Sequence, residues 1–465
     1  MRRTMISIIM TSVLSAALLA GCGSSGNSVS KSAADTSSAT QETVDDAAQS
    51  TPSDEAVDGS STAGEDTAVS TGAPVELTVW SWDKNFNGTA FAEADKLDND
   101  VTVNFVEMGK ADCLQKIHTV LSSGSTEGLP DIVTISDLNA QGYLMAYPGA
   151  FLPMDDYIKY DDFAPYKKGM VSYEGVSYGV PFDTGVAALF YRTDYIQEAG
   201  YTDDQMQNLT WDEYEKLGKK LKDKGHYLQT FNPNDVSNMQ ITLQSCGKWF
   251  TNDQGKADFV KNDALKESYR LFKEFNEGDF CKQVSDWNEF SGAINGGDVA
   301  CVIRGSWITS TIKSAEDQSG KWRMAPIPKL DKVSGATQRS NQGGSSIFVL
   351  AKAPHAKEAA QFLAKTFGGN TELYDTLAKS ANTMGTYLPA GNVEAYSAGD
   401  DFFGGEKINA TLAGWLKEIP QVNPGAYSAE AQSALLAVTP NILNGSDLNS
   451  ELSAAEEQFD ATVQE

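Results

Sequence analysis

Short strand-like and helix-like segments alternate in the first part of the folded body, and this alternation restricts the fold more than any other feature. Val75–Trp80 and Val101–Val106 are rich in β-branched residues, and Asp131–Ile135 repeats the pattern. Residues 91–97 and 112–121 are predicted helices, the second because its apolar residues recur at helical spacing. Strand, helix, strand, helix, strand predicts a parallel sheet with right-handed crossovers, which places ligands at the carboxyl ends of the strands.

The length of the folded body indicates two lobes. From Val75 to Glu465 the chain has about 390 residues, more than one hydrophobic core usually organises. A capping-box pattern at Thr210–Glu213 predicts the start of a helix, and residues 300–303 and 346–350 are further predicted strands. The predicted fold class is therefore α/β.

The N-terminus has the pattern of a secretory signal. Arg2 and Arg3 precede an apolar run, Ile6–Ala20, that closes with Leu-Ala-Gly-Cys at residues 19–22. The run is too short for a transmembrane helix, the alternative interpretation. We predict that residues 1–21 are a lipoprotein signal peptide and that Cys22 is acylated on its thiol and becomes the new N-terminus.

The segment that follows, residues 22–73, contains mainly Ser, Thr, Ala, Gly and acidic residues. Such a composition buries too little apolar surface to offset the entropy of ordering, which predicts a disordered acidic stalk. Two or more acyl chains on one cysteine anchor a protein firmly. We therefore expect a lipid-anchored protein on the outer face of the bacterial cytoplasmic membrane, at a Gram-positive cell surface.

Charge and motif content exclude several classes of function. The net charge of −27 argues against nucleic acid and against contact with anionic lipid other than through the anchor. No H-E-x-x-H, P-loop or C-x-x-C motif is present, so no metal or other cofactor is expected. The remaining cysteines permit three disulfide pairings or free thiols, and both possibilities stay open; they are Cys113, Cys246, Cys281 and Cys301.

Six short motifs follow one another in a recognisable order. They are Val75–Asp83, Leu129–Val133, Tyr178–Gly185 with Ala188–Asp194, Leu209–Tyr214, Gly305–Trp307, and Gly343–Ser346 before Ile347–Ala351. In this order they resemble the extracellular solute-binding proteins of ABC sugar importers, the group that includes maltose-binding protein. The resemblance covers nearly all of Val75–Glu465.

The resemblance implies a two-lobe clamp with a three-crossing hinge and a ligand cleft between the lobes. The crossings would fall near residues 181–188, 324–328 and 384–392. The first lobe would then be residues 74–185 plus 327–386, and the second 186–326 plus 387–465. A protein of this kind is a monomer without catalytic activity that delivers a carbohydrate to ABC permease subunits. Candidate aromatic residues in both lobes favour an oligosaccharide.

The predicted ligand-binding residues lie at strand ends, in the hinge and in glycine-rich turns. Trp82 and Asp83 follow the first strand, and Asp137 follows the third. The resemblance adds Trp307 as an aromatic residue that stacks on a sugar ring. The full set is Trp82, Asp83, Asn85, Asp137, Asp183, Trp307, Gly343, Gly344 and Ser345; unranked aromatic candidates are Tyr191, Trp249, Trp287 and Tyr387. A structural role remains the alternative for each: core packing for a Trp, a helix N-cap for Asp137, and a simple turn for the glycines.

Two other functions fit some of these residues. A secreted glycosidase would use a pair drawn from Asp83, Asp137 and Asp183 as catalytic carboxylates. A surface sensor or adhesin would bind sugar without importing it. The Gly175–Gly179 segment matches the G-x-S-x-G motif of serine hydrolases, but a hairpin turn precedes it and a proline follows, so a nucleophile elbow is not expected.

Overall fold

A computed structural model describes residues 73–252, 254–380 and 384–464. The predicted signal peptide, Cys22 and the stalk up to residue 72 lie outside the described residues. Within the described part of the chain, no helix combines the length and apolar character that crossing a membrane requires.

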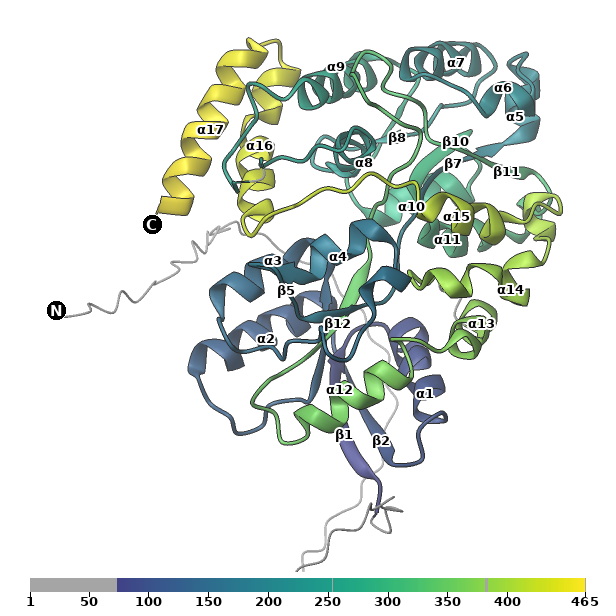
Figure 1. Cartoon of the computed structure of the whole chain (residues 1–465). Helices are drawn as coiled ribbons and strands as arrows, with labels where there is room; N and C mark the ends of the chain where they lie inside the picture. The colour runs from purple at the N-terminus through teal and green to yellow at the C-terminus, as the bar shows by residue number, and fades with distance from the viewer. Residues whose placement is uncertain (1–72, 253, 381–383, 465) are drawn as a thin grey trace, which may run out of the picture. The chain divides into compact units, whose positions relative to one another are not determined.

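The first sheet contains five strands in the order β2-β1-β3-β12-β6. These are β1 (Val75–Ser81), β2 (Val101–Glu107), β3 (Ile132–Ser136), β6 (Gly179–Pro181) and β12 (Ser345–Val349). β1 pairs in parallel with β2 and β3, as the alternating pattern predicted, whereas β12 is antiparallel to both β3 and β6. Figure 1 shows this sheet in its lower half, with α1 (Thr89–Asp95), α2 (Lys110–Ser123), α3 (Asp137–Ala146) and α12 (Ala356–Lys365) around it.

The second sheet is smaller and antiparallel, with the order β10-β7-β11. Its strands are β7 (Ala187–Arg192), β10 (Cys301–Gly305) and β11 (Trp322–Ala325). Two further pairs are β4 (Ser172–Tyr173) with β5 (Val176–Ser177), and β8 (Thr230–Phe231) with β9 (Lys282–Gln283).

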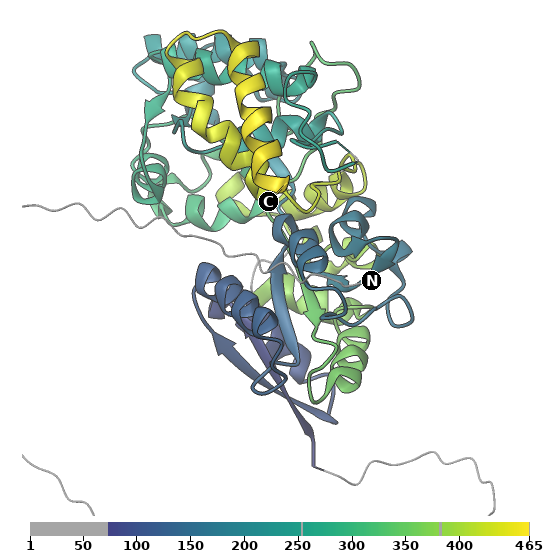
Figure 2. The ribbon, with the colours of Figure 1, turned by 90° about the vertical axis from the view of Figure 1, so that its left-hand side faces the viewer.

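Helices make up most of the remaining structure. They are α4 (Pro165–Val171), α5 (Thr193–Glu198), α6 (Asp203–Met206), α7 (Trp211–Asp223), α8 (Ser237–Ser245), α9 (Asp263–Glu277), α10 (Trp287–Asn295), α11 (Thr309–Lys313), α13 (Thr371–Ser380), α14 (Glu394–Ser397), α15 (Ile408–Leu416), α16 (Ser428–Leu443) and α17 (Leu448–Gln464). Short helical turns are η1 (Lys84–Gly88), η2 (Tyr160–Asp162), η3 (Ser306–Ile308), η4 (Glu316–Gln318), η5 (Leu388–Asn392) and η6 (Asp401–Phe403). The predicted capping box of Thr210 and Glu213 is present at the start of α7. Figure 2 shows α16 and α17 packed side by side.

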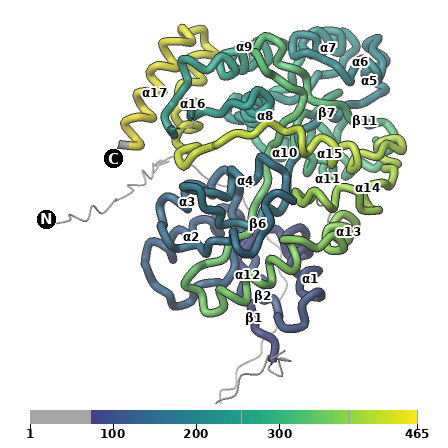
Figure 3. Tube along the Cα trace, in the orientation of Figure 1, coloured from purple at the N-terminus to yellow at the C-terminus, as the bar shows by residue number. Residues whose placement is uncertain are grey.

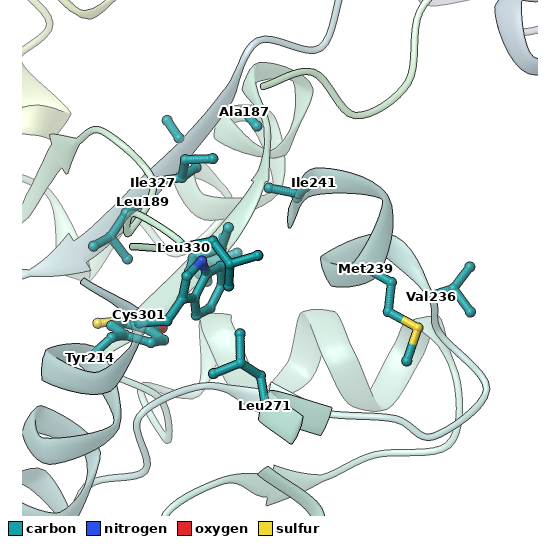
Figure 4. Packing of buried hydrophobic residues seen from close by; sticks show 14 of the residues in the cluster. Ala187, Leu189, Tyr214, Val236, Met239, Ile241, Leu271, Cys301, Ile327 and Leu330 are labelled. Carbon is teal, nitrogen blue, oxygen red and sulfur yellow. The ribbon is translucent and has the colours of Figure 1, made fainter. Parts of the chain in front are cut away.

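Each sheet is covered by its own hydrophobic core. The first core joins residues of β1, β3, β6 and β12 with α1 and α12. The second core joins β7, β10 and β11 with α7, α8, α9 and α16, and Figure 4 shows part of its packing. We call the elements on these cores the first and second lobes. In Figure 3, α12 lies among elements from the start of the body, and Figure 1 shows β12 there as well, so the first lobe is discontinuous in sequence.

Ala164, Tyr166 and Met170 pack on the second core, although the residues on either side of them pack on the first. From Phe182 onward the chain changes core in three regions, and the second lies later than the resemblance implied. The first change falls between Phe182 and Val186, and the third within residues 384–396. β11 pairs with β7, and residues as late as Ala336 still pack on the second core. The chain therefore returns to the first lobe only between Ala336 and Ser345, instead of near 324–328.

The serine-hydrolase motif forms a β-hairpin. Gly175 has a φ of +83° in the turn between β4 and β5, and Ser177 is buried with its Oγ 3.0 Å from Ser172 Oγ. The four cysteines left open by the sequence have free thiols. Burial raises the pKa of the Cys113 thiol to about 11, which disfavours the reactive thiolate.

Candidate functional site

A cavity of about 520 Å³ is lined by residues from both lobes. From the first lobe and the connecting segments it receives Trp82, Asp83, Phe86, Asn87, Lys110, Asp183, Thr184, Gln342, Gly343, Gly344, Ser345 and Met384; from the second lobe it receives Trp287, Ser306, Trp307, Ser310 and Thr311. Seven of the nine predicted ligand-binding residues are in this set. Asn85 and Asp137 are not among the lining residues.

The carboxyl end of β1 supplies one edge of the cavity. Asp83 has a left-handed backbone with a φ of +55°, and its Oδ1 accepts hydrogen bonds from the backbone N–H groups of Asn85 and Phe86, both at 3.1 Å. The carboxylate therefore caps η1. Asn87 donates through Nδ2 to the Trp82 carbonyl at 2.9 Å, while its buried Oδ1 has no partner among the described residues. That amide oxygen is an unpaired acceptor buried behind the cavity surface.

A buried network holds the floor of the cavity together. Asp183 Oδ1 accepts from the Ser345 N–H at 2.6 Å and from the Ser345 hydroxyl at 2.5 Å. Lys167, which is fully buried, donates to Asp137 Oδ2 at 2.6 Å and to the Asp183 and Ser345 carbonyls, each at 3.0 Å. Burial raises the pKa of the Asp183 carboxyl, against the opposing effects of Lys167 and of the bonds from Ser345. The network links the hinge segment at Asp183 to the start of β12.

Asp137 lies beneath this floor rather than facing the cavity. It is the first residue of α3 and is buried, and its second oxygen accepts from the Ser346 hydroxyl at 2.8 Å. Both carboxylate oxygens therefore have partners inside the protein. The predicted alternative, a side-chain N-cap, is also not formed, because Ser136 occupies the N-cap position of α3.

The two glycines in the turn before β12 are required for separate reasons. Gly343 and Gly344 have φ values of +99° and +108°, which residues with a side chain rarely adopt. A Cβ on Gly344 would lie 2.5 Å from Asp137 Oδ2, whereas one on Gly343 would lie 3.3 Å from Trp307 Nε1. Gly344 thus lets the backbone approach the buried network closely.

The second lobe presents aromatic faces to the cavity. Trp287 and Trp307 are 52% and 39% exposed. Among the described residues, these two are the large hydrophobic side chains that are exposed. Their ring centroids are 6.1 Å apart at an interplanar angle of 41°, and Trp307 Nε1 donates to the Gln342 carbonyl at 2.9 Å. This bond holds the Trp307 indole in place with its face open, which suits stacking against the apolar face of a ligand ring.

Lys110 is a cavity residue that the sequence analysis missed. Its Nζ lies 5.5 Å from the Trp82 ring centroid and has no hydrogen-bond partner among the described residues. The side chain is exposed toward the cavity, but partial burial in the walls lowers its pKa, and Asp183 and Asp137 oppose that effect. Lys110 is the first residue of α2, shortly after the carboxyl end of β2. The expectation that ligands bind at the carboxyl ends of strands, which selected Trp82, would therefore also have selected Lys110.

The other aromatic candidates lie elsewhere, with the exception of Trp287. Tyr191 is buried in the second core, and Tyr387 packs on the first. Trp249 lines a different cavity. In the described residues, no group of three or more His, Cys, Asp or Glu side chains has an arrangement that would hold a metal ion.

Comparison with known proteins identifies the class. Residues 88–397 match the family model of bacterial extracellular solute-binding proteins. The chain is also 40% identical over 394 residues to a lactose-binding protein of Rhizobium radiobacter, covering 84% of this chain and 93% of that protein. The chain therefore belongs to the bacterial extracellular solute-binding protein family, as the order of the six motifs indicated.

Solved structures show the same fold. The sugar-binding protein MalE of Xanthomonas citri superimposes with a TM-score of 0.70 at 16% identity, covering 84% of this chain and 98% of that one. A binding protein of Bifidobacterium animalis subsp. lactis, solved with β-1,6-galactobiose, has a TM-score of 0.63 at 22% identity, covering 83% and 96%. These relatives are binding proteins, and the two-lobe clamp predicted from the sequence is confirmed.

Proposed function

We propose that this protein captures a carbohydrate in the cavity between its lobes and delivers it to the membrane subunits of an ABC importer. The observation that supports this proposal most strongly is one cavity that combines the exposed indoles of Trp287 and Trp307 with polar groups from the other lobe. A pyranose ring needs both, because it has apolar faces and an equator of hydroxyl groups. The volume of about 520 Å³ falls within the usual range of small-molecule sites.

The ligand that we propose is a galactose-containing disaccharide such as lactose. The 40% identity to a lactose-binding protein extends over most of both chains and supports this choice. Lys110 Nζ supplies an unused donor for sugar hydroxyls. We extend the ligand-binding role to the predicted residues that line the cavity, with Trp307 as the principal stacking surface.

A role in binding also accounts for the carboxylates better than catalysis does. A glycosidase needs one carboxyl free to donate a proton and another free to act as nucleophile or base. Here Asp83 caps η1, Asp137 pairs with Lys167, and Asp183 bonds to Ser345. Each of the three is committed to an interaction within the protein, so we propose no enzymatic activity.

Calorimetric titration of the purified protein with lactose, galactose and maltose tests this function. The titrated samples should afterwards be separated by chromatography to look for cleavage. We expect one-to-one binding of lactose with the sugar recovered intact. Recovery of glucose and galactose would establish the glycosidase alternative, and absence of binding to every sugar would overturn the carbohydrate assignment.

We also propose that the protein is a monomer anchored at the outer face of the membrane by Cys22, with residues 22–73 as its tether. The support is the Leu-Ala-Gly-Cys sequence at residues 19–22 after a short apolar run. Cys22→Ser should abolish labelling of the protein by a radioactive fatty acid. Cys113→Ser is the matched control, because that thiol is buried in the first core. Fatty-acid labelling of Cys22→Ser equal to that of the wild-type protein would refute the anchor.

A further inference from the structure

A second cavity of about 240 Å³ opens next to the main one. It is formed almost entirely by the second lobe, but it shares Trp287, Trp307 and Gln342 with the main cavity. The two exposed tryptophans therefore stand between two adjoining spaces. Because these residues contribute to both linings, the two cavities adjoin there.

The polar part of the second cavity is built around a buried guanidinium group. Arg304 is 9% exposed and donates through Nη2 to Asp235 Oδ2 at 2.5 Å. Its Nη1 donates to Asn238 Oδ1 at 3.1 Å and to the Ile303 carbonyl at 2.9 Å. The guanidinium also lies over the Phe290 ring, 4.9 Å from the centroid. These contacts hold the planar group in one orientation.

Arg304 retains hydrogen-bonding capacity in this orientation. A guanidinium has five N–H donors, and the hydrogen bonds of the described residues use three of them, two on Nη1 and one on Nη2. The Nε–H and the second Nη2 hydrogen have no partner there. A buried arginine with free donors in a cavity lining is prepared to bind an oxygen-rich ligand.

The charges of this cavity favour a neutral ligand over an anion. Asp235 already neutralises Arg304 through the ion pair at 2.5 Å. Asp286, a second carboxylate in the lining, caps α10 by accepting from the Glu289 N–H at 2.9 Å. The lining therefore carries two carboxylates against one guanidinium, and hydroxyl groups fit it better than a phosphate or carboxylate does.

An aromatic wall completes the second cavity. Trp287 stacks on Phe290 with ring centroids 5.2 Å apart at 29°, and Phe231 and Phe272 also belong to the lining. An apolar wall facing a fixed arginine and its carboxylate suits the two sides of a pyranose ring. The volume of about 240 Å³ is below the roughly 300–1,000 Å³ usual for a complete ligand, so it matches one ring rather than a whole oligosaccharide.

We propose that the second cavity binds the second ring of a disaccharide whose first ring occupies the main cavity, with Arg304 as its specificity-determining residue. This inference rests on the proposed function, since it assigns a subsite to the same carbohydrate. The arrangement makes the protein selective for disaccharides over monosaccharides. Arg304 and Asn238 contact hydroxyls of the second ring, and Trp287 packs between the two rings.

The test compares lactose with methyl β-galactoside and methyl β-glucoside by calorimetry. Arg304→Lys keeps the charge but loses the planar fork, and Asn238→Ala is a milder variant because Asn238 is only partly buried. Arg323→Lys is the matched control, since Arg323 belongs to the same sheet but lines neither cavity. Thermal unfolding checks that each variant is folded.

We expect wild-type protein to bind lactose at least tenfold more tightly than either methyl glycoside. Arg304→Lys should weaken lactose binding about tenfold or more, Asn238→Ala should weaken it less, and Arg323→Lys should leave it unchanged. At least one methyl glycoside should bind wild type and Arg304→Lys equally, because it occupies only the main cavity; a structural defect would weaken every ligand.

Three results would count against these claims, two against the second subsite and one against the proposed function. If lactose binds but folded Arg304→Lys and Asn238→Ala retain wild-type affinity, the second ring is not in this cavity, and the proposed function stands without it. The same holds if lactose and both methyl glycosides are weakened alike. If no sugar binds to wild-type protein, the proposed function itself fails.

Discussion

The two walls of the main cavity are built on opposite physical principles. On the first-lobe side, the lining residues Asp183 and Ser345 form a buried network with Asp137 and Lys167 beneath them. On the second-lobe side, Trp287 and Trp307 leave large apolar faces exposed. The buried network of the first wall holds the hinge and the floor in shape, whereas the two tryptophans of the second wall leave apolar surface for a ligand to cover. Changes on the first wall should therefore affect stability most, and changes on the second should affect affinity.

Breaking the buried ion pair should have the largest effect. Lys167→Met leaves the Asp137 carboxylate buried without its cation, which should lower the free energy of unfolding by about 3–5 kcal/mol. Urea denaturation measures this loss. The double variant Lys167→Met/Asp137→Asn should recover part of it, because no unpaired charge remains. A single variant as stable as wild type would show that the first wall does not depend on this pair.

The comparison of Gly344 with Gly335 separates backbone strain from crowding. Both glycines have positive φ, but a Cβ on Gly335 meets no atom within 4 Å, while one on Gly344 lies 2.5 Å from Asp137 Oδ2. Gly344→Ala should lower the free energy of unfolding by about 1–3 kcal/mol more than Gly335→Ala. Equal losses for the two variants in urea would mean that the close approach to the network costs nothing.

Trp307→Ala tests the second wall. Loss of the stacking surface should weaken lactose binding by about 1–3 kcal/mol and leave the unfolding transition nearly unchanged. Trp415→Ala serves as the control, because Trp415 is partly buried in α15 and does not line the cavity. Calorimetry that finds unchanged affinity for Trp307→Ala would remove Trp307 from the site.

The smallest effect concerns the charge of Lys110. Burial lowers its pKa, so the ammonium form is lost at a lower pH than for an ordinary lysine. If the ammonium donates to a sugar hydroxyl, affinity is full below this pKa and falls by about 1 kcal/mol as the pH rises through it. Lys110→Arg should remove this alkaline fall, since arginine stays charged. An identical pH profile for the two proteins would exclude a contact with Lys110.

Local sequence patterns predicted the elements of the first lobe well. The strands β1, β2 and β3 were recognisable from their β-branched residues, and the helix between β2 and β3 from the spacing of its apolar residues. Both patterns extend over only a few neighbouring residues. The antiparallel insertion of β12 between β3 and β6 was not, because strand pairing depends on residues more than 160 positions apart, such as Ser346 with Pro181. The late return to the first lobe was missed for the same reason, since β11 joins the second sheet only through its long-range pairing with β7.

The chemistry of the site divides in a similar way. By itself, the sequence determined which strand ends, turns and aromatic residues were available. Trp82 follows from its position after a strand, Gly343 from the glycine-rich turn before β12, and Trp307 from the order of the motifs. Only the tertiary structure decided which of them face a ligand. Asp137 and Asp183 both follow strands, yet Lys167 and Ser345 engage their carboxylates from other segments. Lys110 and Arg304 lie at a cavity because packing brings distant segments together, and burial and pairing of polar groups depend on that packing rather than on neighbours in sequence.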